Sequence, residues 1–364
     1  MRKALDKQFL GITAALVTVG FFSFTSASLG LLARDGATFS AVAVNQIVFG
    51  IILGSIALLA ASRFPYRFLR RYAFFIFLAS ITATLLVFVP GLGLEFGGAR
   101  RWVDLGFISF QPAEILKLGF VIYFATWLSG VREKAQTFAS GTLPLIVLLG
   151  ITGTIMLLQP DTGTFLVMVS AGIAMLIAAG GRFSHLAGLG VAAAGLVGTL
   201  AYLRPYVRDR ITTFLDPASD PLGAGYQIQQ SLISIGSGEI FGRGFGQSIQ
   251  KFNFLPEPIG DSIFAVISEE FGFIGATLII TLFIFFVFRG LRIAARSTDR
   301  FGGLLVVGIV ILIASQSFIN IGSMLGVMPL TGVPLVFISH GGTALFLALL
   351  EVGIILSVSR HSSV

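Results

Sequence analysis

Long apolar segments constrain this 364-residue chain more than any other feature. A helix needs about 20 apolar residues to cross the hydrocarbon core of a bilayer. With 55% of its residues hydrophobic and 11% charged, the chain has too little polar surface for a water-soluble globule. The sequence therefore predicts an all-α polytopic membrane protein with ten transmembrane helices, at 9–32, 40–61, 72–90, 113–130, 141–158, 162–180, 184–203, 262–288, 302–327 and 334–358.

The charges between these segments predict the orientation of the chain. With a cytoplasmic N-terminus, the inside segments carry fifteen basic residues against three acidic ones, and the outside segments carry eight against ten. Basic residues concentrate in the cytoplasmic loops of membrane proteins, so we expect both termini in the cytoplasm and one membrane domain over 1–364. The net charge of +7 is divided among short clusters, which argues against nucleic-acid binding.

The longest external segment, 204–261 between the seventh and eighth spans, is expected to carry function, because loops on a rigid scaffold often do. The stretch 91–112 is the next longest external segment. Within the long loop, Gly236–Gly246 reads GSGEIFGRGFG. No strand precedes it and no nucleotide fingerprint is complete, so a flexible re-entrant turn is favoured over a phosphate-binding loop.

A carboxylate, Asp261, stands where the long loop enters the membrane. Pro256, Pro258 and Gly260 prevent a helix from forming before it, and an apolar pattern begins at Ser262. A carboxylate at membrane depth costs free energy and therefore indicates function, although Asp261 could instead cap the helix that follows.

Two glutamates follow on the same expected helix. At about 100° per residue, Glu269 lies about 80° from the face of Asp261 and Glu270 about 180° from it. We therefore expect only Glu269 to approach the same cavity, with Glu270 buried against another helix or paired with an arginine.

Three further charged residues stand at or within the spans. Glu114 and Lys117 are separated by one helical turn, so they can pair; the pair either locks helices together or lines a polar cavity open to the outside. Asp161 follows Gln159–Pro160 at the outer end of a span. It can cap the next helix and can be a site residue as well.

The outer side also gathers basic residues: Arg100, Arg101, Arg204, Arg208, Arg210, Arg243 and Lys251. One guanidinium group can bond two phosphate oxygens at once. These arginines therefore suit an anionic, membrane-bound substrate such as a pyrophosphate-linked lipid. Asp261 would act as general base on a hydroxyl. Arginines, or a divalent cation (Mg or Mn) held by acidic residues, would stabilise the departing pyrophosphate. The chain has no cysteine, which excludes thiol catalysis.

Several motifs along the chain together resemble one family. The stretch Asn320–Thr343 reads NIGSMLGVMPLTGVPLVFISHGGT, and it is accompanied by GARRWVDLG at 98–106, QPAEILKL at 111–118, QPDTGT at 159–164, GYQIQQSLISIGSGEIFGRGFG at 225–246 and LPEPIGDSIFAVISEEFGFIG at 255–275. This set is similar to the signature of the SEDS family (shape, elongation, division and sporulation; RodA, FtsW and SpoVE). His340 and Pro258–Ile259–Gly260 depart from the family pattern, and the second departure bears on how Asp261 is presented.

The resemblance implies a peptidoglycan glycosyltransferase of the bacterial cytoplasmic membrane that polymerises lipid II into glycan strands at the outer face. It implies that Asp261 is the essential acidic residue and that Glu114 and Lys117 are the intramembrane pair. The family's outer-face site residues fall on Arg100, Arg101, Asp161 and either Arg208 or Arg210. The implied partners are lipid II, a class B penicillin-binding protein and the elongation machinery. The short tail before the first span and the end of the chain soon after the last favour the RodA branch.

Two other functions fit a polytopic chain. A lipid II flippase needs a cationic path through both leaflets, whereas here the charges within the membrane gather near the outer face and only Glu351 lies deep; no inverted repeat is evident either. A non-catalytic scaffold for the penicillin-binding protein would leave Asp261 dispensable.

Overall fold

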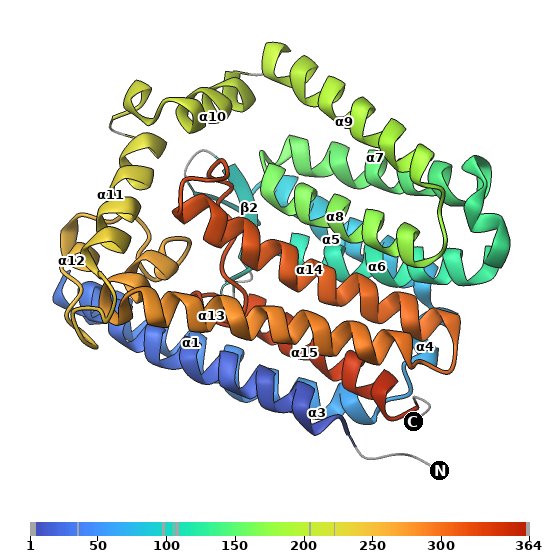
Figure 1. Cartoon of the computed structure of the whole chain (residues 1–364), viewed down its shortest axis with the longest axis horizontal. Coiled ribbons are helices and arrows are strands. Elements are labelled where there is room, and N and C mark those ends of the chain that lie inside the picture. The colour runs from blue at the N-terminus through green and yellow to red at the C-terminus, as the bar shows by residue number, and fades with distance from the viewer. Residues whose placement is uncertain are drawn as a thin grey trace.

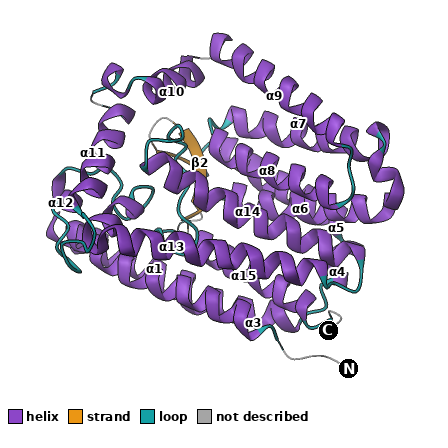
Figure 2. Cartoon of the chain, in the orientation of Figure 1, coloured by secondary structure: helices purple, strands orange, loops and turns teal. Residues whose placement is uncertain are grey.

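The computed structural model describes residues 5–361 except 35, 97–98, 105, 107–108, 204 and 222. Helices run side by side in a bundle (Figure 1), and helix is the dominant secondary structure (Figure 2). The helices are α1 (Lys7–Arg34), α2 (Gly36–Val44), α3 (Gly54–Arg63), α4 (Arg67–Arg71), α5 (Ala73–Leu85), α6 (Pro112–Val131), α7 (Leu143–Leu158), α8 (Thr162–Ala178), α9 (Phe183–Leu203), α10 (Pro205–Leu215), α11 (Ala224–Ser237), α12 (Gln250–Asn253), α13 (Ile263–Ala295), α14 (Arg300–Met324) and α15 (Gly342–Ser359).

The helices match the predicted spans in position. Within the described residues, eight helices are long and apolar enough to cross a membrane. One of them, Phe39–Arg63, joins α2 to α3 through a π-helical segment, Asn45–Leu53. The predicted spans 72–90 and 162–180 coincide with shorter apolar helices, Ala73–Phe88 and Thr162–Ala178. The polytopic all-α class is confirmed, and the count of ten remains a prediction.

Two predicted spans differ from the observed helices. The span predicted from 334 begins only at Gly342, because the segment before it is irregular and includes glycines in the positive-φ region, Gly332 (φ +67) and Gly341 (φ +155). The span predicted at 262–288 is α13, which is interrupted at Gly272 (φ +64, ψ −162). Glycine adopts these angles without the steric cost that a Cβ brings.

Both long external segments contain regular structure. The stretch 91–112 forms a small antiparallel sheet in the order β1–β2–β3, made of β1 (Gly93–Phe96), β2 (Ala99–Asp104) and β3 (Ser109–Phe110). The long loop 204–261 carries α10, α11 and α12, which lie along the outer edge of the bundle (Figure 1).

Helix α14 lies at the centre of the bundle, between α8 and α13 (Figure 1), and most of its side chains are buried. Glycines permit close helix contacts here, as in other membrane bundles. A Cβ on Gly308 would lie 2.4 Å from Val121 of α6, and one on Gly290 of α13 would lie 2.5 Å from Val310 of α14. This packing gives the external segments a rigid base.

The segments predicted to be cytoplasmic meet at one end of the bundle. Arg289 Nη2 lies 2.7 Å from Asp6 Oδ2 and Arg67 Nε lies 3.5 Å from Asp299 Oδ2, and α11 and α12 lie at the opposite end of α13 (Figure 1). The molecule therefore has two distinct polar ends, as the charge pattern requires.

Candidate functional site around Asp261

A tight turn presents Asp261. The carbonyl of Glu257 accepts hydrogen bonds from the amides of Gly260 and Ser262, both at 3.1 Å, and Glu257 itself has φ +47. Ser262, not Asp261, is the N-cap of α13, and no side-chain capping bond forms there. The capping alternative for Asp261 is therefore wrong.

The family-like segment 320–343 holds this turn through hydrogen bonds to the backbone carbonyls of the turn. Asn320 Nδ2 donates to the carbonyl of Asp261 at 2.8 Å and to that of Val333 at 2.9 Å. Ser339 Oγ donates to the carbonyl of Gly260 at 2.7 Å, and the amide of His340 donates to that of Ile259 at the same distance. The irregular conformation of 325–341 thus fixes the position of Asp261.

Asp261 lines a cavity of about 160 Å³. The walls come from α10, α11, α14 and the segment 330–333. The polar lining residues are Arg210, Thr213, Gln227, Asp261, Asn320, Ser323 and Thr331. Gln227 Nε2 also donates to Ser262 Oγ at 3.0 Å, which ties α11 to the start of α13.

Arg101 lies beside Asp261. A Cβ on Gly332 would be 3.4 Å from Asp261 Oδ2 and 3.6 Å from Arg101 Nη1, so the two groups flank this glycine. Arg101 comes from β2 and donates to the carbonyls of Gln159 and Pro160, which fixes its direction. Arg210 of α10 donates to Thr162 Oγ1 at 3.2 Å.

The surroundings of Asp261 favour a proton acceptor that works near neutral pH. Burial raises the pKa of Asp261 to about 6, and the negative charge of Glu257 adds to this effect. Arg101 and Arg210 act in the opposite direction, while Asp161 adds a smaller increase. A general base is most effective when its pKa lies near the working pH.

Asp161 has the capping role that the sequence allowed. Its Oδ1 accepts the amide of Thr164 at 3.2 Å at the start of α8, and its Oδ2 accepts Gln111 Nε2 at 3.3 Å. The side chain is buried. Its negative charge makes a small contribution to the pKa of Asp261, and its role as a site residue stays a prediction.

The Glu114–Lys117 pair forms, with Lys117 Nζ 2.8 Å from Glu114 Oε1, and Lys117 also donates to Gln316 of α14. Both line a second, smaller cavity of about 20 Å³ together with Glu351. The segment 330–340 contributes to both cavities: Leu330–Val333 line the first, and Pro334–Phe337, Ser339 and His340 line part of the second. The structure thus separates the pair from Asp261.

Two of the arginines predicted to be site residues lie away from this cavity. Arg100 and Arg208 are exposed, and neither is among the described residues that line the Asp261 cavity. Arg100 neighbours Arg101 on one strand, so the two side chains point to opposite faces. Arg204 lies outside the described residues.

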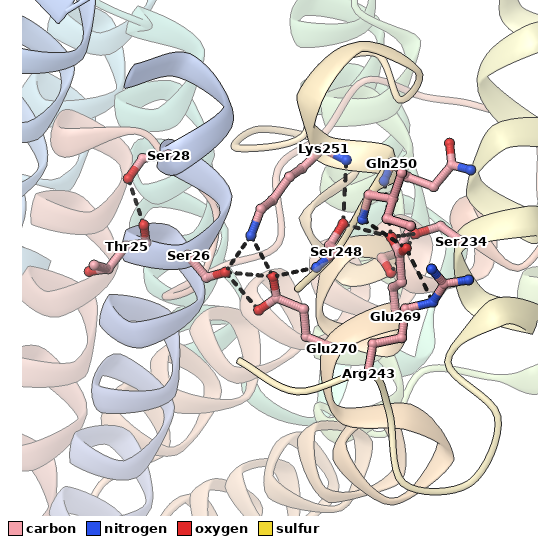
Figure 3. Close-up of polar contacts among 12 residues, drawn as sticks. Thr25, Ser26, Ser28, Ser234, Arg243, Ser248, Gln250, Lys251, Glu269 and Glu270 are labelled. Carbon is pink, nitrogen blue, oxygen red and sulfur yellow. Dashed lines mark hydrogen bonds and ion pairs between the residues drawn. The ribbon is translucent and has the colours of Figure 1, made fainter. Parts of the chain in front are cut away.

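The expectation that Glu269 approaches the Asp261 cavity is wrong. Its carboxylate accepts Ser248 Oγ at 2.6 Å and Ser234 Oγ at 3.1 Å (Figure 3). Glu270 is buried, as expected, but it pairs with Lys251, 2.7 Å away, and not with an arginine. The break at Gly272 brings the loop after α11 against both glutamates, a contact that helical angles alone do not give.

The chain matches the family model described as cell cycle protein, which covers FtsW, RodA and SpoVE, over residues 7–364. The chain belongs to this SEDS family. It is 41% identical to stage V sporulation protein E of Bacillus subtilis over 352 residues, 96% of each chain. It is 38% identical over 310 residues to a probable peptidoglycan glycosyltransferase FtsW of Geobacter sp. strain M18, covering 85% of this chain and 84% of the relative.

Solved structures of SEDS proteins have the same architecture. A structure on the coordination of polymerization and crosslinking by a peptidoglycan synthase complex aligns with a TM-score of 0.81 at 29% identity, over 98% of both chains. The rod shape determining protein RodA of Thermus thermophilus aligns with a TM-score of 0.70 at 26% identity, over 98% of this chain and 97% of that one. Membership of this family makes the chain a multi-pass protein of the bacterial cytoplasmic membrane.

Sequence reasoning missed the polar residues that hold and line the site, above all Asn320, Gln227 and Ser339. Asn320 and Ser339 both lie in the family-like segment. An asparagine near the end of an apolar helix could have singled out Asn320, because a buried side-chain amide needs hydrogen-bond partners, which are often backbone carbonyls.

Proposed function

We propose that this SEDS protein is a peptidoglycan glycosyltransferase that polymerises lipid II at the outer face of the membrane. The observation that carries the proposal is a partly buried carboxylate, Asp261, lining a cavity between two arginines, Arg101 and Arg210. Relatives named as probable peptidoglycan glycosyltransferases support it.

In this mechanism, Asp261 accepts the proton of the 4-hydroxyl on the acceptor sugar while that oxygen bonds to the anomeric carbon of the donor. The bond from the anomeric carbon to the pyrophosphate oxygen breaks, and undecaprenyl pyrophosphate leaves with inversion at that carbon. Arg101 and Arg210 stabilise the negative charge that develops on the leaving group, as fixed cations do in other transfer reactions.

A divalent cation fits this chemistry, because Mg²⁺ commonly binds one or two carboxylates together with substrate phosphates. Glu257, whose charge reaches Asp261, would hold it and leave Asp261 free as the base, and the cation would neutralise pyrophosphate charge. Within the described residues, no group of three or more His, Asp or Glu side chains forms a metal site, so the substrate would have to supply the remaining ligands.

A class B penicillin-binding protein is the proposed partner. The support is the likeness to the peptidoglycan synthase complex that coordinates polymerization and crosslinking. Such a partner would cross-link the strands that this protein makes.

The proposed cellular role is wall synthesis during elongation. The RodA likeness agrees with it, while the relatives named SpoVE and FtsW make sporulation and division the competing roles. Depletion in the native host tests this: round cells are expected, whereas filaments of normal width or a sporulation defect alone would assign the competing role.

Polymerisation of labelled lipid II by the purified protein with its partner tests the activity. Wild type should form glycan, and Asp261→Asn should form none. Asp209→Asn, an exposed aspartate in the same external loop, is the matched control and should retain activity. Glycan from Asp261→Asn would refute the mechanism. Absence of glycan from wild type, with lipid II translocation in vesicles, would favour the flippase.

A further inference from the structure

The helix that follows Asp261 is short and separate from the rest of α13. At Gly272 the backbone leaves helical geometry, so a nine-residue segment, 263–271, precedes the break. A Cβ on Gly272 would lie 2.4 Å from the amide nitrogen of Gly242 and 2.5 Å from the carbonyl oxygen of Ile240. The loop after α11 bonds to the backbone on both sides of this break, at Glu269 and Glu270 before it and at Phe273 and Ile274 after it, so contacts other than the long membrane span help to set the orientation of this segment.

Two carboxylates near the C-terminal end of this segment attach it to its surroundings. Glu270 accepts Ser26 Oγ at 2.6 and 2.7 Å, and Lys251 Nζ at 2.7 Å (Figure 3). Lys251 Nζ also donates to Ser26 Oγ at 3.0 Å. Ser26 and Lys251 are fully buried and Glu270 is 1% exposed. This trio joins α1, α12 and α13.

Glu269 binds the loop on the other side. It accepts the amide of Ile249 at 3.0 Å in addition to the hydroxyls of Ser234 and Ser248, and Arg243 Nε lies 3.7 Å from its Oε1 (Figure 3). Helix α11, which carries Ser234, also contributes Gln227 to the Asp261 cavity. Glu269 thus connects the short helix to α11, which lines the site, and Glu270 connects it to α1 and α12.

Stability alone does not account for these groups. Carboxylates near a helix C-terminus oppose the helix dipole, and burying an ion pair costs about as much as the pair returns. Buried polar groups can instead select one geometry among several. We propose that Ser26, Lys251 and Glu270 form a clamp that positions Asp261 for catalysis. These are positioning residues, and the inference rests on the proposed glycosyltransferase function.

The test removes the charges of the clamp together, because a single change would leave one buried charge unpaired. The variant is Lys251→Met with Glu270→Gln. The matched control is Asp6→Asn with Arg289→Gln, since this ion pair joins the residue just before α1 to α13 with a 2.7 Å contact, at the end of both helices opposite to the clamp. Lipid II polymerisation, thermal melting and hydrogen exchange of 254–263 are measured for each.

The clamp variant should keep its melting temperature and its KM within about twofold, while kcat falls by about 100-fold, as displacement of a catalytic group by about 1 Å can cause. Hydrogen exchange of 254–263 should accelerate. The control should retain wild-type kcat and exchange. Unchanged kcat in the clamp variant, or equal losses in both variants, would overturn the proposal.

A milder variant covers the case in which the double variant does not fold. Ser26→Ala removes the hydroxyl contacts and keeps the ion pair; it should raise exchange of 254–263 and lower kcat by several-fold. Wild-type exchange in this variant would overturn the clamp. If wild type forms no glycan, the proposed function fails; the exchange measurement judges the clamp independently of activity.

Discussion

The pH dependence of polymerisation follows directly from the surroundings of Asp261. The general base must be ionised, and its pKa is about 6. About 90% of the carboxylate is ionised one pH unit above that pKa and about 10% one unit below it. The acid limb of kcat/KM should therefore be centred near pH 6, with a tenfold loss for each further pH unit downward.

Two single substitutions should move this midpoint in opposite directions. Glu257 raises the pKa of Asp261 and Arg101 lowers it. Glu257→Gln should shift the midpoint down and Arg101→Gln should shift it up, each by about one pH unit, since a nearby charge shifts a carboxyl pKa by roughly this amount. Arg101→Gln should also lower the maximal rate, because a cation beside the leaving group is lost.

The assay is the initial rate of glycan formation from labelled lipid II at subsaturating concentration, measured across the pH range for wild type and both variants. Asp209→Asn serves as the unshifted reference. A wild-type midpoint near the ordinary aspartate value of 3.8, or a shift of both variants in the same direction, would refute the assignment of the acid limb to Asp261.

Three other substitutions test the site, one of them with a matched control. Because burial raises the pKa of Asp261 above its unfolded value, its stabilising contribution is present at low pH and lost as the pH rises through about 6; Asp261→Asn should therefore melt no lower than wild type at neutral pH, and a clear drop would contradict this. Gly332 and Gly91 both have a positive φ, but only an alanine at 332 places a methyl group between Asp261 and Arg101. Gly332→Ala and Gly91→Ala should each lower the free energy of unfolding by about 1–2 kcal/mol, and only Gly332→Ala should lose polymerisation activity. Asn320→Ala should lose about 2–4 kcal/mol in denaturant titration, since two buried carbonyls lose their donor, and wild-type stability would count against the role of Asn320.

Most of the fold could be predicted because bilayer thickness leaves a strong signal in composition. Apolar length alone placed most of the helices within a few residues; the exceptions are the end of α13 at Ala295 and the start of α15 at Gly342. It did not reveal that the predicted span at 334 begins as an irregular segment, because Leu335, Val336 and Phe337 are apolar in either conformation and are buried against protein.

The site was less accessible to sequence reasoning. Asp261, Arg101 and Asp161 could be proposed as site residues from their chemistry at the outer boundary and from the family-like motifs, and the structure places Asp261 and Arg101 side by side. The position of Glu269 could not be predicted from the sequence, because it depends on the break at Gly272 and on a close contact with the loop before α12. A Cβ at Gly238 of that loop would lie 1.9 Å from the carbonyl oxygen of Ser268. The backbone turns at 238–241, as the sequence favoured, and Gly238 and Gly242 pack closely against the short helix that follows Asp261.

The most direct test of the central claim measures binding and turnover of labelled lipid II in the same preparations of wild type and Asp261→Asn, each in complex with its partner. If Asp261 is the general base, both proteins should bind lipid II with similar affinity, and only wild type should convert it to glycan. Turnover by Asp261→Asn at a rate near that of wild type would contradict the account.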